Sequence, residues 1–227
     1  MINPMDLSGK RILLVGDSSK LDNVLSEQIL SLGGCVYRCE FLNLDDIENQ
    51  IKSHMNDTEA FDGFVFNIVH SDFRPLKYVM PALVDSIMHD NYGAFIEVMR
   101  VLKKLRGLAI GASVVAISSI SSIRAMKAKM AFCSAKAALD AAIRCLALEL
   151  TDKAIRVNSI QKGVVDSDFE KGHIQDVASI NDGEAEKKTP LGPSSAVEIA
   201  NVVAFLLSDA TKTITGTSIV IDGGYTL

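Results

Sequence analysis

Three positions in the sequence carry groups that could contact a ligand or move a proton. Gly16 ends an apolar run and precedes a helical pattern, so it lies at the carboxyl end of an expected strand, where α/β folds bind ligands. Ser119 follows a later apolar run, and Lys136 lies within a long helical pattern. A hydroxyl and an ammonium are hydrogen-bond donors, although a strand-end serine and a helix-surface lysine need no function. Asp85 and His89 are the one pair that resembles metal ligands, and we predict no metal site.

Composition and charge exclude several classes of protein. The chain has 227 residues and a net charge of −5, and its basic residues are scattered, so we expect no nucleic-acid partner. The apolar stretch 108–117 is shorter than the roughly 20 residues of a membrane span. Residues 1–11 are polar and lack a signal core. We therefore expect a cytoplasmic protein without a membrane partner. The cysteines form no C-x-x-C pair and are expected to be buried structural thiols: Cys35, Cys39, Cys133 and Cys145.

Apolar runs alternate with helical patterns along the whole chain. The expected strands are 10–15, 35–41, 63–68, 113–118, 156–160 and 218–222. The expected helices are 21–29, 44–51, 91–105, 131–150 and 199–207, the last preceded by a capping box from Ser195 to Glu198. This alternation predicts one α/β domain over 1–227. Its expected core is a doubly wound, Rossmann-type, mostly parallel sheet of about six strands with helices on both faces.

Four segments go beyond generic α/β patterning. They are Ile117-Ser118-Ser119, Phe132-Cys-Ser-Ala-Lys136, Arg156-Val-Asn-Ser-Ile160, and an ending that runs from Ile214 through Asp222-Gly-Gly-Tyr225. Together they resemble the short-chain dehydrogenase/reductase family, and within it the 3-oxoacyl-carrier-protein reductases. The resemblance covers essentially the whole chain and is strong from Ser113 onward. It implies an NAD(P)-dependent oxidoreductase of ketones or alcohols, of the 3-oxoacyl or keto-sugar type.

The catalytic residues that the resemblance implies are Ser119, Lys136 and Phe132, the last in the position of a tyrosine. Ser119 lies 13 residues before Phe132, and Lys136 lies 4 after it, as the family pattern requires. In the family a lysine lowers the pKa of the tyrosine, which acts as general acid or base, and the serine polarises the carbonyl. Phe132 has no proton to give. Because general acid catalysis contributes on the order of 100- to 10,000-fold, the usual activity is expected to be weak or lost.

The implied cofactor is NAD or NADP, held by eight residues. They are Gly16, Ser18, Ser19, Leu21, Asn67, Lys136, Gly163 and Val165. The family's T-G-x-x-x-G-x-G turn retains one glycine of three here, since Lys20 and Asp22 stand at the other two. Asp17 and Asp22 add negative charge where phosphates would meet the helix N-terminus, and Lys20 could partly compensate.

Further departures from the family surround the same cleft. The family's N-A-G reads Asn67-Ile-Val, its helix asparagine corresponds to Asp90, and its P-G reads Lys162-Gly163. Asn43 is a candidate replacement for the adenine-contacting aspartate, and Glu40 is a weak selector between NAD and NADP. Only 51 positions separate Gly16 from Asn67, which predicts a trimmed adenosine side.

Three functional readings follow from these residues. The first is an NAD(P)-dependent oxidoreductase of a small-molecule substrate, with water or His70 as substitute proton donor. The second is a non-catalytic family member, a pseudo-enzyme, retained for assembly or ligand binding. The third is an elimination or isomerisation that requires no tyrosine. The apolar face of 91–105 and the small-residue face of 131–150 resemble the family's subunit contacts, so we expect a homo-oligomer, a dimer or tetramer.

Overall fold

The protein is described by a computed structural model that covers residues 3–40, 44–55, 59–165 and 189–227. Its centre is one parallel sheet of six strands in the order β2-β1-β3-β4-β5-β6. The strands are β1 (Arg11–Gly16), β2 (Cys35–Glu40), β3 (Phe61–Asn67), β4 (Leu108–Ser119), β5 (Arg156–Lys162) and β6 (Ser218–Ile221). The predicted Rossmann-type sheet and its strand number are confirmed.

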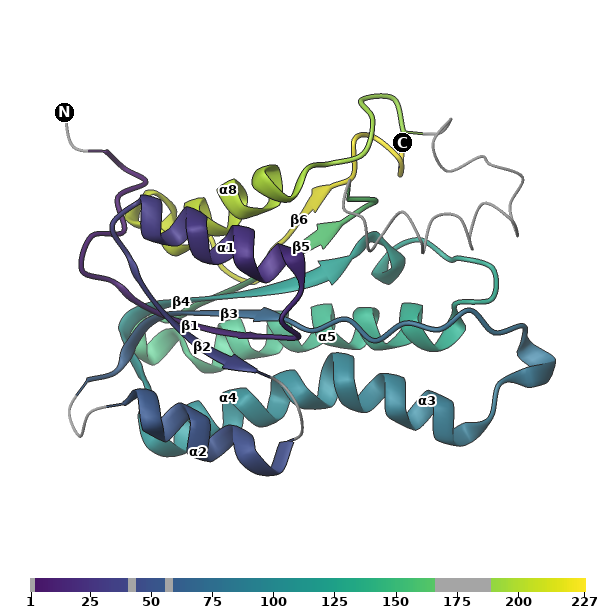
Figure 1. Ribbon diagram of the computed structural model, residues 1–227, viewed down its shortest axis with the longest axis horizontal. Helices are drawn as coiled ribbons and strands as arrows, with labels where there is room; N and C mark the ends of the chain where they lie inside the picture. Colours follow the sequence, from purple (N-terminus) through teal and green to yellow (C-terminus); the bar gives the residue numbers. More distant parts are fainter. Residues whose placement is uncertain (1–2, 41–43, 56–58, 166–188) are drawn as a thin grey trace.

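Helices cover both faces of this sheet (Figure 1). On one face lie α1 (Lys20–Ser31) and α8 (Ala196–Leu207), which pack against each other. On the other lie α2 (Leu44–His54), α4 (Ala94–Leu105) and α5 (Met130–Glu149), with α3 (Pro81–Met88) beyond the strand ends. Short 3-10 turns are η1 (Leu76–Tyr78), η3 (Ile120–Ser122), η4 (Thr151–Lys153) and η5 (Asp209–Thr211).

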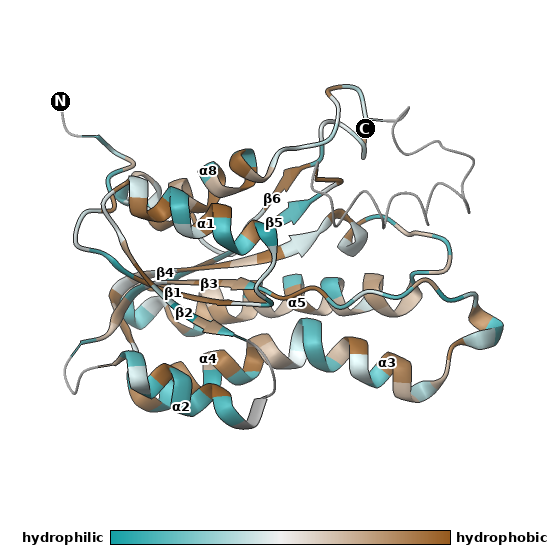
Figure 2. Ribbon diagram, viewed as in Figure 1, coloured by the Kyte–Doolittle hydropathy of each residue, from teal (hydrophilic) through white to brown (hydrophobic). Residues whose placement is uncertain are grey.

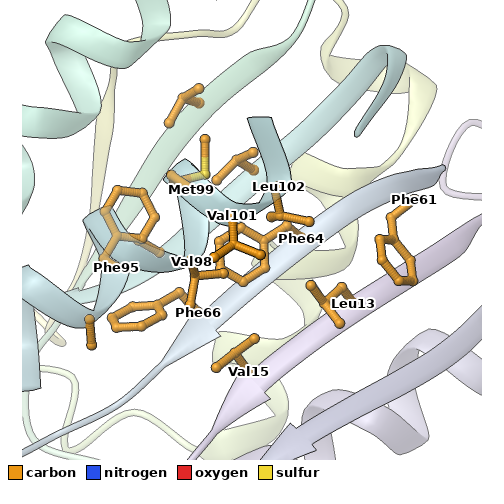
Figure 3. Packing of buried hydrophobic residues seen from close by; sticks show 14 of the residues in the cluster. Leu13, Val15, Phe61, Phe64, Phe66, Phe95, Val98, Met99, Val101 and Leu102 are labelled. Atoms are coloured by element: carbon orange, nitrogen blue, oxygen red, sulfur yellow. The ribbon is translucent and has the colours of Figure 1, made fainter. Parts of the chain in front are cut away.

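The core consists of two apolar layers, one on each side of the sheet. Figure 2 shows hydrophobic colour along β1 and β3, hydrophilic colour on β5, and hydrophilic patches on the helices. In the layer under α4 and α5, Phe64 and Phe66 of β3 meet Phe95 of α4, with ring centroids 6.2 and 5.3 Å apart (Figure 3). Strands buried on both faces produce the continuous apolar runs seen in the sequence.

The helical segment before α4 is longer than predicted. It begins at Pro81, and α3 is joined to α4 by a π-helical turn, η2 (His89–Gly93). Pro81 occupies the first turn of α3, where its missing N–H leaves no helical bond unmade. A π-helical turn is uncommon and is frequent at functional sites. It lies beside the segment that follows β3, because the side chain of Asn91 bonds the backbone of His70.

The thiols are only partly as expected. Cys39 is buried and Cys133 half-buried, whereas Cys35 and Cys145 are exposed, so the prediction that all four are buried is wrong. Cys35 begins β2, an edge strand, and Cys145 lies on the exposed side of α5. No helix in the described part of the chain is long and apolar enough to cross a membrane.

Candidate active site and cofactor loop

The strand order reverses direction beside β1, and this places the candidate residues at one edge of the sheet. Chain connections run from β1 outward to β2 and then back across to β3, which makes a switch point at the carboxyl ends of β1 and β3. In open α/β sheets this is where ligands bind. Gly16 ends β1 and pairs in register with Glu40 of β2 and Asn67 of β3.

The loop after β1 brings Ser18 and Ser19 to the start of α1. Ser19 is the N-cap and forms a capping box with Asp22. The serine oxygen accepts a hydrogen bond from the backbone N–H of Asp22. Ser18 has a left-handed backbone with φ of 61°, and its hydroxyl donates to Glu40 at 2.9 Å. Leu21 is half-buried and packs against the apolar layer beneath α1 and α8. The loop therefore has the form of a phosphate-binding turn without two of its glycines.

Asp22 and Asn67 form a buried contact at the same place. The Asn67 amide donates to the Asp22 carboxylate at 2.7 Å and to the Ser19 hydroxyl at 3.3 Å. Only 1% of Asp22 and 2% of Asn67 are exposed. Burial raises the pKa of the Asp22 carboxyl above its ordinary value, and the hydrogen bond from Asn67 opposes the rise. A carboxylate thus lies where a dinucleotide phosphate would meet the helix, and the residues present do not fit a pyrophosphate.

Lys136 is fully buried at the ends of the central strands. Its ammonium donates to the carbonyls of Ile68 and Ile117 at 3.1 and 3.2 Å. Burial, together with the nearby Lys162 ammonium, lowers the pKa of Lys136 to about 7. A helix-surface lysine would keep its ordinary pKa, so that interpretation of Lys136 is wrong. Because Ile68 follows Asn67 directly, Lys136 and the loop after β1 meet at one site.

Phe132 lies one helical turn before Lys136 and is packed as a core residue. It is buried in an apolar cluster with Ile87, Ala131 and Ala135, against which Val69 also packs. The ammonium groups of Lys129 and Lys136 lie 5.4 and 5.7 Å from the centre of its ring. The ring is therefore an apolar neighbour of two lysine side chains, and it provides no proton.

Ser119 ends β4 and is engaged locally. Its hydroxyl donates to Ser121 Oγ at 3.1 Å and accepts from the Ser121 backbone N–H at 3.1 Å. Ser119 also pairs in register with Lys162 at the end of β5. The serine, the phenylalanine and the lysine that the family pattern singles out thus come from the adjacent elements β4 and α5.

Gly163 and Val165 follow β5 and contact the C-terminal turn and the adjoining loop. A Cβ atom at Gly163 would lie 2.8 Å from the Cα atom of Asp222, so only glycine fits there. Val165 is buried and forms an isolated bridge with Ser194. The long predicted loop 163–193 continues through 166–188, which lie outside the described residues, as does Asn43.

His70 and Asp90, which are twenty residues apart in the chain, form a hydrogen-bonded pair. His70 Nδ1 lies 2.7 Å from Asp90 Oδ2, and His89 Nδ1 lies 2.9 Å from the other oxygen of Asp90. The His70 side chain is 38% exposed, so its ring can reach solvent or a ligand. His89 is thus hydrogen-bonded to Asp90. The described residues contain no group of three or more metal-ligating side chains.

Two features of the site were missed by sequence reasoning. Asn91 is fully buried, and its amide donates to the carbonyls of His70 and Ile87 at 2.7 and 2.9 Å, which fixes the segment after β3. Asp140 of α5 accepts from Ser159 at 2.8 Å and from Gln161 at 2.7 Å, which fastens the helix of Lys136 to β5. Neither residue stands out locally, because both act through partners distant in sequence.

The fold and the switch-point site define a Rossmann-type α/β protein of the nucleotide-binding class. A family model described as enoyl-(acyl carrier protein) reductase matches residues 5–226. The chain belongs to the short-chain dehydrogenase/reductase family of oxidoreductases. The predicted family is confirmed.

Known proteins resemble the chain at low identity. D-erythrulose reductase of Gallus gallus is 30% identical over 171 residues, which are 73% of this chain and 67% of that protein. The 3-oxoacyl-[acyl-carrier-protein] reductase FabG of Rickettsia conorii is 28% identical over an alignment of 246 positions that covers 97% of this chain and 98% of that protein. A gluconate 5-dehydrogenase from Burkholderia cenocepacia, solved with NADP and tartrate, superposes with a TM-score of 0.87 at 18% identity, covering 98% and 97%.

Proposed function

We propose that this chain has lost the family's tyrosine-dependent carbonyl reduction and acts as a non-catalytic family member in assembly or ligand binding. The proposal rests on Phe132, which stands in the tyrosine position and is buried against Ile87 and Val69. A phenyl ring neither donates nor accepts a proton, so Lys136 has no phenol whose pKa it could lower. The eroded loop, in which Asp22 replaces a glycine, points to the same conclusion.

The surface of α4 and α5 supports a role in assembly. A groove between these helices is lined by apolar residues that include Ile96, Met99, Leu146 and Leu150, and by charged residues that include Arg100 and Glu149. An apolar surface bordered by polar residues is typical of protein contacts. We propose that a second copy of this chain binds there and forms a dimer or tetramer. Sedimentation that shows only monomer at micromolar concentration would refute this part of the proposal.

Turnover assays test the loss of chemistry. The purified chain is mixed with NADH or NADPH and a panel of keto sugars and 3-oxoacyl thioesters, and oxidation of the nicotinamide is followed by absorbance. We expect no rate above background. Wild-type turnover within a factor of about 100 of the roughly 10 per second that is typical of enzymes would overturn the proposal.

A second candidate function rests on the 2.7 Å contact between His70 and Asp90. In this reading the protein is a carbonyl oxidoreductase in which His70 replaces the tyrosine as proton donor and Asp90 holds the ring, as a carboxylate does for many catalytic histidines. If the wild type turns over any substrate, His70→Asn separates the two readings. Loss of turnover on the order of 100-fold supports the histidine donor, and unchanged turnover excludes it.

A further inference from the structure

The N-terminus of α1 already carries an anion that belongs to the chain. Asp22 is the third residue of the helix, and its carboxylate accepts from the Ser19 backbone N–H at 3.2 Å and from Asn67 at 2.7 Å. Free N–H groups at a helix N-terminus bind phosphates or carboxylates, because they combine hydrogen-bond donors with a partial positive charge. Here an internal carboxylate takes part of that binding capacity.

The carboxylate also fills the space beside Gly16, at the turn that leads into the helix. A Cβ atom at Gly16 would collide with all three atoms of the Asp22 carboxyl group, so this group lies directly against the glycine backbone. In dinucleotide-binding folds the three glycines allow a tight turn, the close approach of the pyrophosphate and the close packing of helix on strand. Lys20 and Asp22 stand at the second and third of these positions, and the Asp22 carboxylate fills the space against Gly16, the first.

Capping of the helix does not by itself explain the burial of Asp22. Helix α8 has the same capping box, formed by Ser195 and Glu198, and there the carboxylate is exposed. In α1 the carboxylate is drawn inward by Asn67, whose own side-chain oxygen is buried and has no hydrogen-bond partner among the described residues. The asparagine thus directs its amide N–H to Asp22 while its oxygen makes no bond.

Charge reinforces this closure. Asp17, in the same loop, is exposed, and its like charge raises the pKa of Asp22. Arg38 of β2 lowers that pKa, but its effect is the weakest of these influences. The Arg38 guanidinium is itself bonded to Asn23 at 2.9 Å. A pyrophosphate brought to this loop would meet the carboxylates of Asp17 and Asp22, whose charge Lys20 only partly compensates, and would have to displace Asp22 from the helix end.

We propose that Asp22 is an internal anion that occupies the phosphate position at the N-terminus of α1 and thereby blocks dinucleotide binding by this chain. The inference deepens the proposed function, on which it rests for the view that hydride transfer is not the role of the protein. It assigns the closure of the nucleotide half of the site to one side chain. Substitution of that side chain should therefore reopen the helix end.

The experiment measures binding and not activity. Calorimetric titration with NADH and with NADPH is performed on the wild type, Asp22→Gly and Asp22→Asn. We expect no saturable binding by the wild type at about 1 mM and an affinity at least about tenfold higher for Asp22→Gly, because the glycine removes both the charge and the obstruction. Asp22→Asn removes only the charge and should give a smaller gain.

A matched control separates closure from loss of a helix cap. Glu198→Gln changes the equivalent residue of the capping box in α8 and should leave binding unchanged. Wild-type binding with a Kd below about 100 μM would overturn the proposal, as would a folded Asp22→Gly that binds no better than the wild type. If Asp22→Gly does not fold, Asp22→Asn decides, and equal affinity for it and the wild type refutes the proposal.

These outcomes are distinct from failure of the proposed function. Turnover by the wild type would contradict the loss of chemistry, and it is measured without any Asp22 variant. Tight binding without turnover would contradict only the blocking role of Asp22. Gain of binding in Asp22→Gly without turnover would support both.

Discussion

Lys136 should make the stability of this protein depend on pH in a particular direction. Burial lowers its pKa from an ordinary 10.5 to about 7 in the folded state. Between these two values the unfolded chain binds a proton that the folded chain does not, so raising the pH favours folding. Above about pH 10.5 Lys136 is neutral in both states and lowers the free energy of unfolding by nothing. As the pH falls from there through about 7, this stability is lost. Each pH unit within the window is worth up to ~1.4 kcal/mol.

Replacement of Lys136 by methionine removes this titration. From pH 7 to pH 9 the free energy of unfolding of the wild type should rise by about 2 kcal/mol more than that of Lys136→Met, since the wild type is half protonated at the start. Loss of the hydrogen bonds to Ile68 and Ile117 shifts the variant's stability by an amount that does not depend on pH. Urea unfolding at pH 7, 8 and 9 measures the slope.

Lys212→Met is the matched control, because Lys212 is an exposed lysine outside the proposed subunit contact. It should show the wild-type slope. If Lys136→Met and the wild type have parallel pH profiles, the buried ammonium does not titrate in this range, and the reasoning is refuted. The outcome bears on chemistry as well, since a lysine that is half neutral near pH 7 differs from the fixed cation of the family pattern.

Two further predictions concern the packing of the sheet. Gly63→Ala should destabilise the protein by about 1–3 kcal/mol, because its new methyl group would lie 2.7 Å from atoms of both Ile12 and Leu207, and an unchanged thermal midpoint would contradict this. Cys39, whose pKa burial raises to about 12, should resist alkylation at pH 8 while exposed Cys35 and Cys145 react; peptide mass spectrometry that finds native Cys39 labelled would contradict the burial.

Much of the fold could be predicted because the signals are local. Parallel strands covered on both sides must be apolar along their whole length, so β1, β3 and β4 appear as continuous runs. The capping box of α8 satisfies two backbone N–H groups within four residues, and the structure has it where the sequence placed it. The π-helical turn before α4 was not predicted, since its partner is His70, some twenty residues away.

The candidate site likewise has features that are local in the sequence and features that depend on tertiary contacts. The presence of Phe132 at a tyrosine position and of Asp22 at a glycine position can be read from the sequence once the motifs are aligned. That Asp22 turns inward onto Gly16 and Asn67, instead of pointing to solvent as Glu198 does, depends on a strand 45 residues away. Side-chain direction at a helix end is decided by what packs beside it, which no local pattern records.

The sequence by itself thus determined the class of fold, the family and the identity of the altered residues, because each depends on residue types at fixed spacing. Tertiary structure alone decided that Lys136 is fully buried beside Lys162 and that His70 and Asp90 form a pair. These contacts join elements that are distant in the chain, and their energies depend on burial and on distances between charges. Both quantities come into existence only when the strands are assembled into one sheet.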